Sequence, residues 1–152
     1  MSSTRIARHI RAPRSAVYGA LLDARAIATW RVPMGMTCVV HEFDAREGGS
    51  FRISLTYDSP SAIGKTTAHT DTYHGHFARV VPNQQVVEVL EFETADPALR
   101  GEMTIITTLV DADVGTDVLV VYEGLPPGVS VTDNELGTRM SLDKLAALVE
   151  SG

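Results

Sequence analysis

The sequence predicts one α+β domain, residues 1–152, in which a curved antiparallel sheet wraps around a long C-terminal helix. Apolar and polar residues alternate for about ninety residues from Met36 onward, as in strands with one buried face. After Pro127 the apolar spacing becomes helical and stays so to about Val149. An antiparallel sheet with one apolar face needs an apolar cover, and this last helix is the only predicted element long enough.

The first thirty residues or so are predicted to form one strand and two short helices. Alternation over residues 4–11 predicts the strand. Pro13 suits the first turn of a helix over 13–22, and Asp23 can cap a second helix over 24–29.

Six further strands follow in series, separated by loops rich in glycine, proline and aspartate. Because these connections are short, neighbouring strands must pair antiparallel. A seven-stranded sheet that twists strongly touches a single helix along only part of its length, so we expect an apolar cavity between them. The six strands are predicted near 36–44, 50–57, 67–81, 85–93, 102–111 and 116–123.

The final helix can be capped by Ser130 or by Thr132, the latter forming a capping box with Glu135. Its predicted core stripe contains Val131, Thr138, Leu142, Leu145 and Val149.

Leu136 and Met140 fall on nearly the opposite side of this helix. Either the segment from Trp30 to Met36 covers them, or they are exposed singly, or they form the contact of a homodimer.

Composition excludes several classes of partner. A net charge of -6 and scattered lysines and arginines exclude a nucleic-acid-binding surface. No apolar run is long enough for a signal peptide or a membrane span, so we expect a cytoplasmic protein. The single cysteine, Cys38, lies in an alternating apolar run and is interpreted as a small core residue, with a reactive thiol as the alternative.

The densest group of polar residues lies on the strand predicted at 67–81. His69, Asp71 and Tyr73 share one face with Phe77, which suggests that this face points inward. A histidine beside a carboxylate can act as a general base, and the alternative is a polar rim at the mouth of the cavity.

On the other face, His74 and His76 provide two metal ligands where a catalytic zinc needs three. We therefore expect a solvated histidine pair and no metal. Gly48-Gly49 lacks the lysine and the helix of a phosphate-binding loop, so no cofactor is predicted.

Arg8 lies between Ile6 and Ile10 on the face expected to meet the core, where a guanidinium must be paired. Glu88 and Glu123 interrupt apolar strands and are the candidate partners, and a ligand carboxylate is the alternative. Trp30, at the end of the second helix, is predicted to lie in the core or in the cavity wall.

Together these motifs resemble the START-like, or SRPBCC, superfamily, and within it the branch of activator of heat-shock-protein ATPase homologues. The resemblance covers nearly the whole chain. The matching residues are Ile6-x-Arg8-x-Ile10-x-Ala12-Pro13 with Val17-Tyr18, Trp30, Gly48-Gly49-Ser50-Phe51-Arg52, Tyr73-His74-Gly75-His76-Phe77 with Val81-Pro82, Gly115-Thr116 and Gly137-Thr138-x-Met140-Ser141-Leu142-x-x-Leu145.

The resemblance implies a helix-grip fold whose internal pocket takes sterols, lipids, polyketides or plant hormones in many relatives. Many relatives carry tryptophan where this chain has Thr138, so the resemblance implies a larger or more open pocket here. We expect a small hydrophobic or aromatic ligand. The alternatives are a cyclase- or hydrolase-type enzyme using His69, Asp71 and Tyr73, or a co-chaperone-like interaction domain. The candidate ligand-binding residues are Arg8, Trp30, His69, Asp71, Tyr73, Phe77, Thr138 and Leu142.

Overall fold

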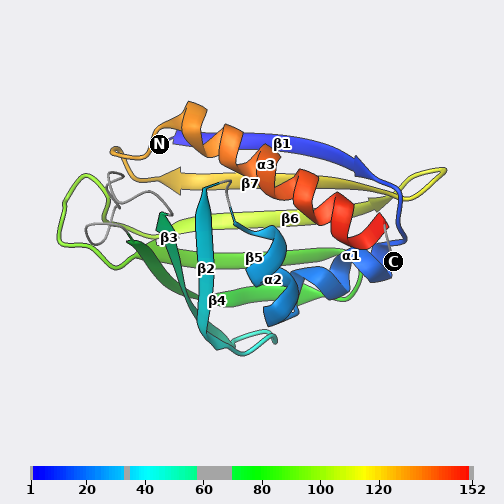
Figure 1. The fold of residues 1–152 in the computed structure, drawn as a ribbon, viewed down its shortest axis with the longest axis horizontal. Helices are drawn as coiled ribbons and strands as arrows, with labels where there is room; N and C mark the ends of the chain where they lie inside the picture. The colour runs from blue at the N-terminus through cyan, green and yellow to red at the C-terminus, as the bar shows by residue number, and fades with distance from the viewer. Residues whose placement is uncertain (1, 33–34, 58–69, 151–152) are drawn as a thin grey trace.

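The computed structural model describes residues 2–32, 35–57 and 70–150 (Figure 1). In these ranges the elements follow the predicted order, which is one strand, two short helices, six strands and a long helix. The elements are β1 (Ser2–Ile10), α1 (Arg14–Leu21), α2 (Ala24–Trp30), β2 (Met36–Phe43), β3 (Ser50–Tyr57), β4 (Thr70–Val81), β5 (Gln85–Phe92), β6 (Met103–Asp111), β7 (Thr116–Leu125) and α3 (Val131–Glu150).

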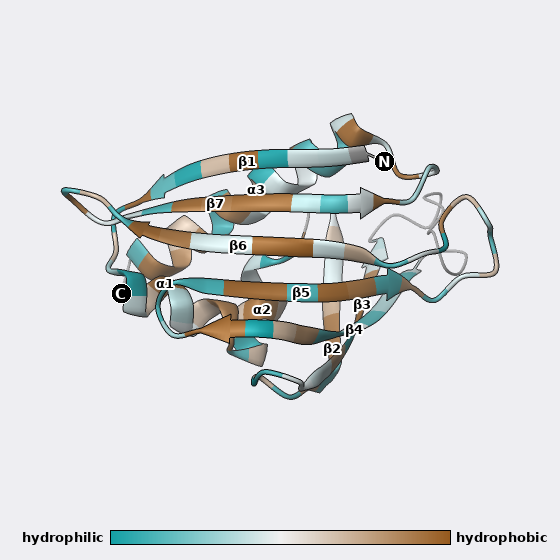
Figure 2. Cartoon of the chain, turned by 180° about the vertical axis from the view of Figure 1, so that it is seen from behind, coloured by the Kyte–Doolittle hydropathy of each residue, from teal (hydrophilic) through white to brown (hydrophobic). Residues whose placement is uncertain are grey.

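In the described ranges seven strands form one antiparallel sheet in the order β1-β7-β6-β5-β4-β3-β2. Strands β2 to β7 follow one another as a meander, and β1 joins the far edge beside β7. All three helices lie on the same side, since the view from behind shows the strands with no helix in front of them (Figure 2). The predicted α+β helix-grip fold is therefore confirmed.

Two irregularities in strand pairing help the sheet to curve around α3. The register shifts between Val40 and Glu42 in β2 and between Phe77 and Arg79 in β4. A bulge of this kind increases the local twist and bends the strand. Gly75 contributes in another way, because a Cβ there would collide with the backbone of β5 at Val89. Only glycine lets the two strands approach so closely.

The core lies between the concave face of the sheet and the helices. In β5 the inward residues are Val86, Glu88 and Leu90, which alternate with half-buried neighbours. From α3, Leu142 and Leu145 are 2% and 0% exposed. The predicted packing of this helix on the sheet is confirmed at these two positions.

Side-chain caps fix the start of two helices. The Asp23 carboxylate accepts from the backbone N–H groups of Arg25 and Ala26, as predicted for the short helix α2. For α3, the Ser130 hydroxyl accepts from the N–H of Asp133 at 3.2 Å. Of the two residues proposed for this cap, Ser130 provides it, because Thr132 already lies inside the helix.

None of the helices in the described part of the chain is long and apolar enough to cross a membrane.

We expect Leu145→Ala to lower the free energy of unfolding by about 2–5 kcal/mol, because the change leaves a cavity at a fully buried site. Urea denaturation measures this. Leu148→Ala on the same helix is the matched control, since Leu148 is 37% exposed and its truncation should cost much less. A loss below about 0.5 kcal/mol for Leu145→Ala, typical of a surface substitution, would contradict the observed packing.

Candidate functional site

A cavity of about 470 Å³ lies between the first half of α3 and the sheet. It is located where β3, β5 and β7 end and β4 and β6 begin, at the end of the molecule where α3 starts (Figure 1). Its sheet wall is apolar and includes Leu55, Leu90, Met103 and Ile105. The volume falls within the range of pockets that bind small organic molecules.

The helix wall explains why the space is not filled. Gly137, Thr138 and Ser141 line the cavity from α3, and all three have small side chains. The Thr138 hydroxyl donates to the carbonyl oxygen of Asn134 at 2.7 Å, one turn earlier in the helix. Small residues on this stretch of α3 therefore leave a gap beneath the curved sheet.

The base of the cavity holds an ion pair. Arg31, directly after α2, lines the cavity and donates from Nη1 and Nη2 to the two carboxylate oxygens of Glu88, at 2.6 and 3.1 Å. The Arg31 and Glu88 side chains are only 15% and 4% exposed. The Arg31 guanidinium also stacks on the Trp30 ring, 4.9 Å from its centroid.

The pair keeps Arg31 charged. Burial alone lowers the pKa of the Arg31 guanidinium, but the negative charge of Glu88 and the hydrogen bonds to it raise that pKa above its ordinary value. Burial raises the pKa of the Tyr73 and Tyr122 hydroxyls, although the nearby Arg31 charge partly opposes the shift. Both tyrosines line the cavity and stay protonated at neutral pH.

The Cys38 side chain packs against the core and is partly buried. Burial raises the pKa of its thiol despite the positive charge of Arg31. A raised pKa disfavours the reactive thiolate, which supports the interpretation of Cys38 as a packing residue.

The structure separates the sequence-predicted site residues into groups. Asp71, Tyr73 and Thr138 line the cavity. Trp30, Phe77 and Leu142 are buried in the core but are not part of its wall, and the Trp30 indole N–H donates to the carbonyl oxygen of Ala20 at 2.9 Å. His69 lies outside the described residues.

Arg8 does not have the partner that the sequence suggested. Its side chain is 38% exposed, and its Nε donates to Asp143 of α3 at 3.0 Å. Glu88, one of the two proposed partners, binds Arg31 instead. The expectation of a buried Arg8 was wrong because a long side chain between two inward residues can extend past the edge of β1 to the surface of α3.

Leu136 and Met140 lie at the mouth of the cavity. Leu136 is 54% exposed, and Met36 lines the same cavity close to the start of β2. The helical wheel placed these two apolar residues nearly opposite the core stripe. In the structure they line the opening of the cavity instead.

Sequence reasoning missed Arg31 and Tyr122. The available signal was Glu88, a carboxylate in an apolar strand that required a buried cation. Glu88 was instead assigned, together with Glu123, as a candidate partner of Arg8, whereas Arg31 follows the last residue of a short helix.

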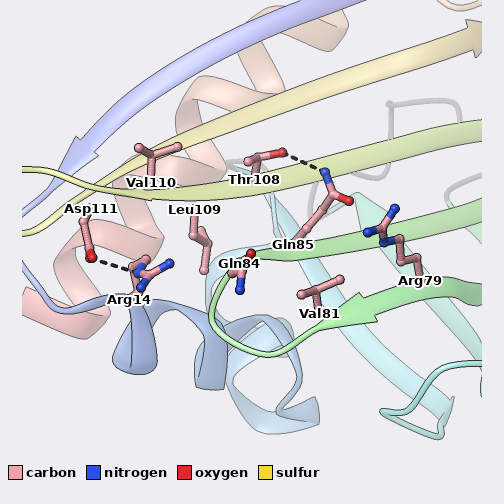
Figure 3. A pocket seen from close by; sticks show the side chains of 9 residues that line it. All are labelled: Arg14, Arg79, Val81, Gln84, Gln85, Thr108, Leu109, Val110 and Asp111. Carbon is pink, nitrogen blue, oxygen red and sulfur yellow. Dashed lines mark hydrogen bonds and ion pairs between the residues drawn. The ribbon is translucent and has the colours of Figure 1, made fainter.

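A second hollow of about 410 Å³ lies at the opposite end of the sheet, between α1 and the ends of β4 and β6 (Figure 3). Two pairs of its polar residues bind each other: Arg14 pairs with Asp111 at 2.9 Å, and Gln85 donates to Thr108 at 3.2 Å. Val110 in its rim is 53% exposed. The hollow is thus a surface depression, and the cavity beneath α3 is the stronger candidate site.

On the outer face of the sheet His74 lies between two carboxylates. Its Nδ1 is 3.0 Å from Glu93 and its Nε2 is 3.2 Å from Glu91, and Glu93 also forms a bidentate pair with Arg52. In the described ranges no three potential ligands come together to hold a metal ion. Hydrogen bonds from Arg52 lower the pKa of Glu93 to about 2, against the effect of its partial burial.

Comparison with known proteins agrees with this geometry. The family model of the Activator of Hsp90 ATPase homolog 1-like proteins matches residues 11–150. No curated protein matches the chain.

Among solved structures, a protein from Chromobacterium violaceum is 32% identical, with a TM-score of 0.87 over 97% of this chain and 96% of its own. A protein from Rhodobacter sphaeroides is 15% identical, with a TM-score of 0.81 over 99% of this chain and 93% of its own. The Activator of Hsp90 ATPase homolog 1-like protein from Aeromonas hydrophila is 20% identical, with a TM-score of 0.75 over 99% of this chain and 93% of its own. The last two show the fold alone.

We expect Glu88→Leu to destabilise the protein by about 3–5 kcal/mol, because it leaves the Arg31 charge buried without a partner. The double variant Arg31→Met, Glu88→Leu should regain much of that loss, since neither charge is then buried. Urea denaturation of both single variants and the double variant forms the cycle. If the losses of unfolding free energy in the two single variants simply add up in the double variant, Arg31 and Glu88 do not interact as described.

For Glu93→Gln we expect a loss of about 1 kcal/mol at neutral pH, the size measured for partly exposed ion pairs. Because the folded pKa of Glu93 is about 2, below its ordinary 4.5, its contribution is complete above pH 4.5 and disappears as the pH falls through 2. Denaturation midpoints across this pH range measure the effect. Glu91→Gln, which removes a contact to His74 but none to Arg52, is the control and should have less pH dependence in this range. If Glu93→Gln lowers stability by the same amount at pH 2 and at neutral pH, the pKa of Glu93 is not lowered as described.

Proposed function

The chain belongs to the family of the Activator of Hsp90 ATPase homolog 1-like proteins, and we propose that it binds a small lipophilic molecule in the cavity beneath α3. The observation that supports this most is the cavity itself, about 470 Å³ with apolar walls and a few polar groups gathered at its base. Such a combination is typical of ligand pockets, where apolar area provides affinity and a few polar groups fix orientation.

The cavity is suited to an apolar guest for a second reason. Water is held in a protein interior by several polar partners, and the side chains of Leu90, Met103 and Ile105 offer none over their part of the sheet wall, beside the hydroxyl of Tyr122. Burying the apolar surface of a ligand there is favourable by about 25 cal/mol per Å². Leu136 and Met140 at the mouth would extend this contact toward solvent.

An enzymatic role is the second candidate, because Asp71 and Tyr73 are both buried and line the cavity. The Tyr73 hydroxyl, with its raised pKa, is a donor and not a base at neutral pH. In such an enzyme the base would have to be Asp71 or His69. The co-chaperone role, the homodimer through Leu136 and the cytoplasmic location stay predictions from the sequence.

Binding of a neutral apolar fluorophore, N-phenylnaphthylamine, tests the proposal. We expect saturable binding to one site, detected by probe emission and by energy transfer from Trp30, which is the only tryptophan. Thr138→Trp should weaken binding by about ten-fold or more, because the indole would occupy the space that the ligand needs.

Arg139→Trp is the matched control, since Arg139 is exposed on the same helix and does not line the cavity. It should bind the probe like the unchanged protein. The proposal fails if the unchanged protein does not bind the probe, or if both variants weaken binding equally while remaining folded by circular dichroism.

A further inference from the structure

We infer that the ligand is an uncharged lipophile with a carbonyl-type oxygen, such as a ketone, ester or lactone, which accepts hydrogen bonds from Arg31 at the base of the cavity. A carboxylate such as a fatty acid does not fit. This inference rests on the proposed function and adds to it the chemical class of the ligand and the direction in which it enters.

The base of the cavity is rich in hydrogen-bond donors. A guanidinium has five N–H groups, and two of those on Arg31 donate to Glu88, so three remain. Arg31 lines the cavity, so part of its side chain borders the space that a guest would occupy. Tyr73 and Tyr122 add two protonated hydroxyls within the influence of the Arg31 charge, and that of Tyr122 is also hydrogen bonded to the Thr138 side chain. Groups that donate from several directions are best satisfied by an oxygen with lone pairs.

The charges around the cavity disfavour an anion. Arg31 is already neutralised by Glu88, whose side chain is 4% exposed and cannot move away into solvent. The other acidic groups in the lining are Asp71, which is buried, and Asp133 near the mouth. Arg31 is the only lysine or arginine in this lining among the described residues. Among the described residues of the lining, a carboxylate at the base would meet no positive charge other than that of Arg31, which Glu88 already compensates, and it would lose its hydration.

The distribution of apolar residues sets the orientation. Met36, Phe92, Leu136 and Met140 line the cavity and are less buried than Tyr73 and Leu90 nearer its base. Arg31 follows α2 and lies on the inner side of β5, whereas Leu136 and Met140 belong to the first half of α3 (Figure 1). The ligand therefore enters with its oxygen first and leaves its apolar tail among the residues of the mouth.

Competition against N-phenylnaphthylamine tests the inference with three probes of matched length: a phenylalkyl methyl ketone, the corresponding phenylalkanoate and the corresponding alkylbenzene. We expect the ketone to bind about ten-fold or more tightly than the alkylbenzene, because one or two net hydrogen bonds correspond to about that factor. It should also bind more tightly than the phenylalkanoate, whose charge would be desolvated beside a guanidinium that Glu88 already neutralises. In the double variant Arg31→Met, Glu88→Leu the ketone should lose its advantage over the alkylbenzene.

Tyr122→Phe is a milder second variant in case the double variant does not fold, and it should reduce the advantage of the ketone over the alkylbenzene by several-fold. The inference is overturned if the phenylalkanoate binds as tightly as the ketone, or if the advantage of the ketone survives in every folded variant. Absence of fluorophore binding would instead refute the proposed function, and the inference with it.

Discussion

The structure depends on one geometric constraint: a single helix covers the concave face of a strongly curved sheet. The two can pack closely only over part of their length, and here close packing occurs at the second half of α3, where Leu142 and Leu145 are almost completely buried. Over the first half and at the middle of the helix, the small residues Gly137, Thr138 and Ser141 leave the space open. Close packing and the open cavity thus lie along different parts of the same helix. A ligand can occupy one half without disturbing the packing of the other.

The Arg31–Glu88 pair closes this cavity at its base and connects α2 to the middle of the sheet. Replacing such a pair by apolar residues is often neutral for stability, so its presence is not explained by stability alone. Its position suggests another explanation, because a paired guanidinium stays fixed in place while part of its donor edge faces the cavity. The ion pair thus holds a guanidinium in place in the cavity lining, beside the polar side chains of Tyr73 and Tyr122.

The sequence was sufficient for the fold and for part of the site. Alternation and helical spacing located the strands and helices, since burial on one face repeats with a fixed period, and Asp23 and Ser130 were recognised as possible caps by their local chemistry. Asp71, Tyr73 and Thr138 were found because inward-facing positions follow from the same period. Periodicity says which face is buried but not which distant residue lies opposite. Glu88 was therefore recognised as needing a partner, while Arg31 was missed and Arg8 was misassigned.

The hydrogen bonds and the ion pair that fix α2 and the residues after it limit which substitutions the protein can tolerate. The Trp30 indole is hydrogen bonded to Ala20, Arg31 is paired with Glu88, and Lys144 of α3 donates to the carbonyl oxygen of Val32. A substitution that removes the charge of Arg31 would have to be accompanied by a substitution of Glu88 in β5, because Glu88 would otherwise be a buried charge without its partner. Leu136 at the mouth is under no such restriction. Single substitutions are therefore tolerated more easily at the rim of the cavity than at the Arg31–Glu88 pair.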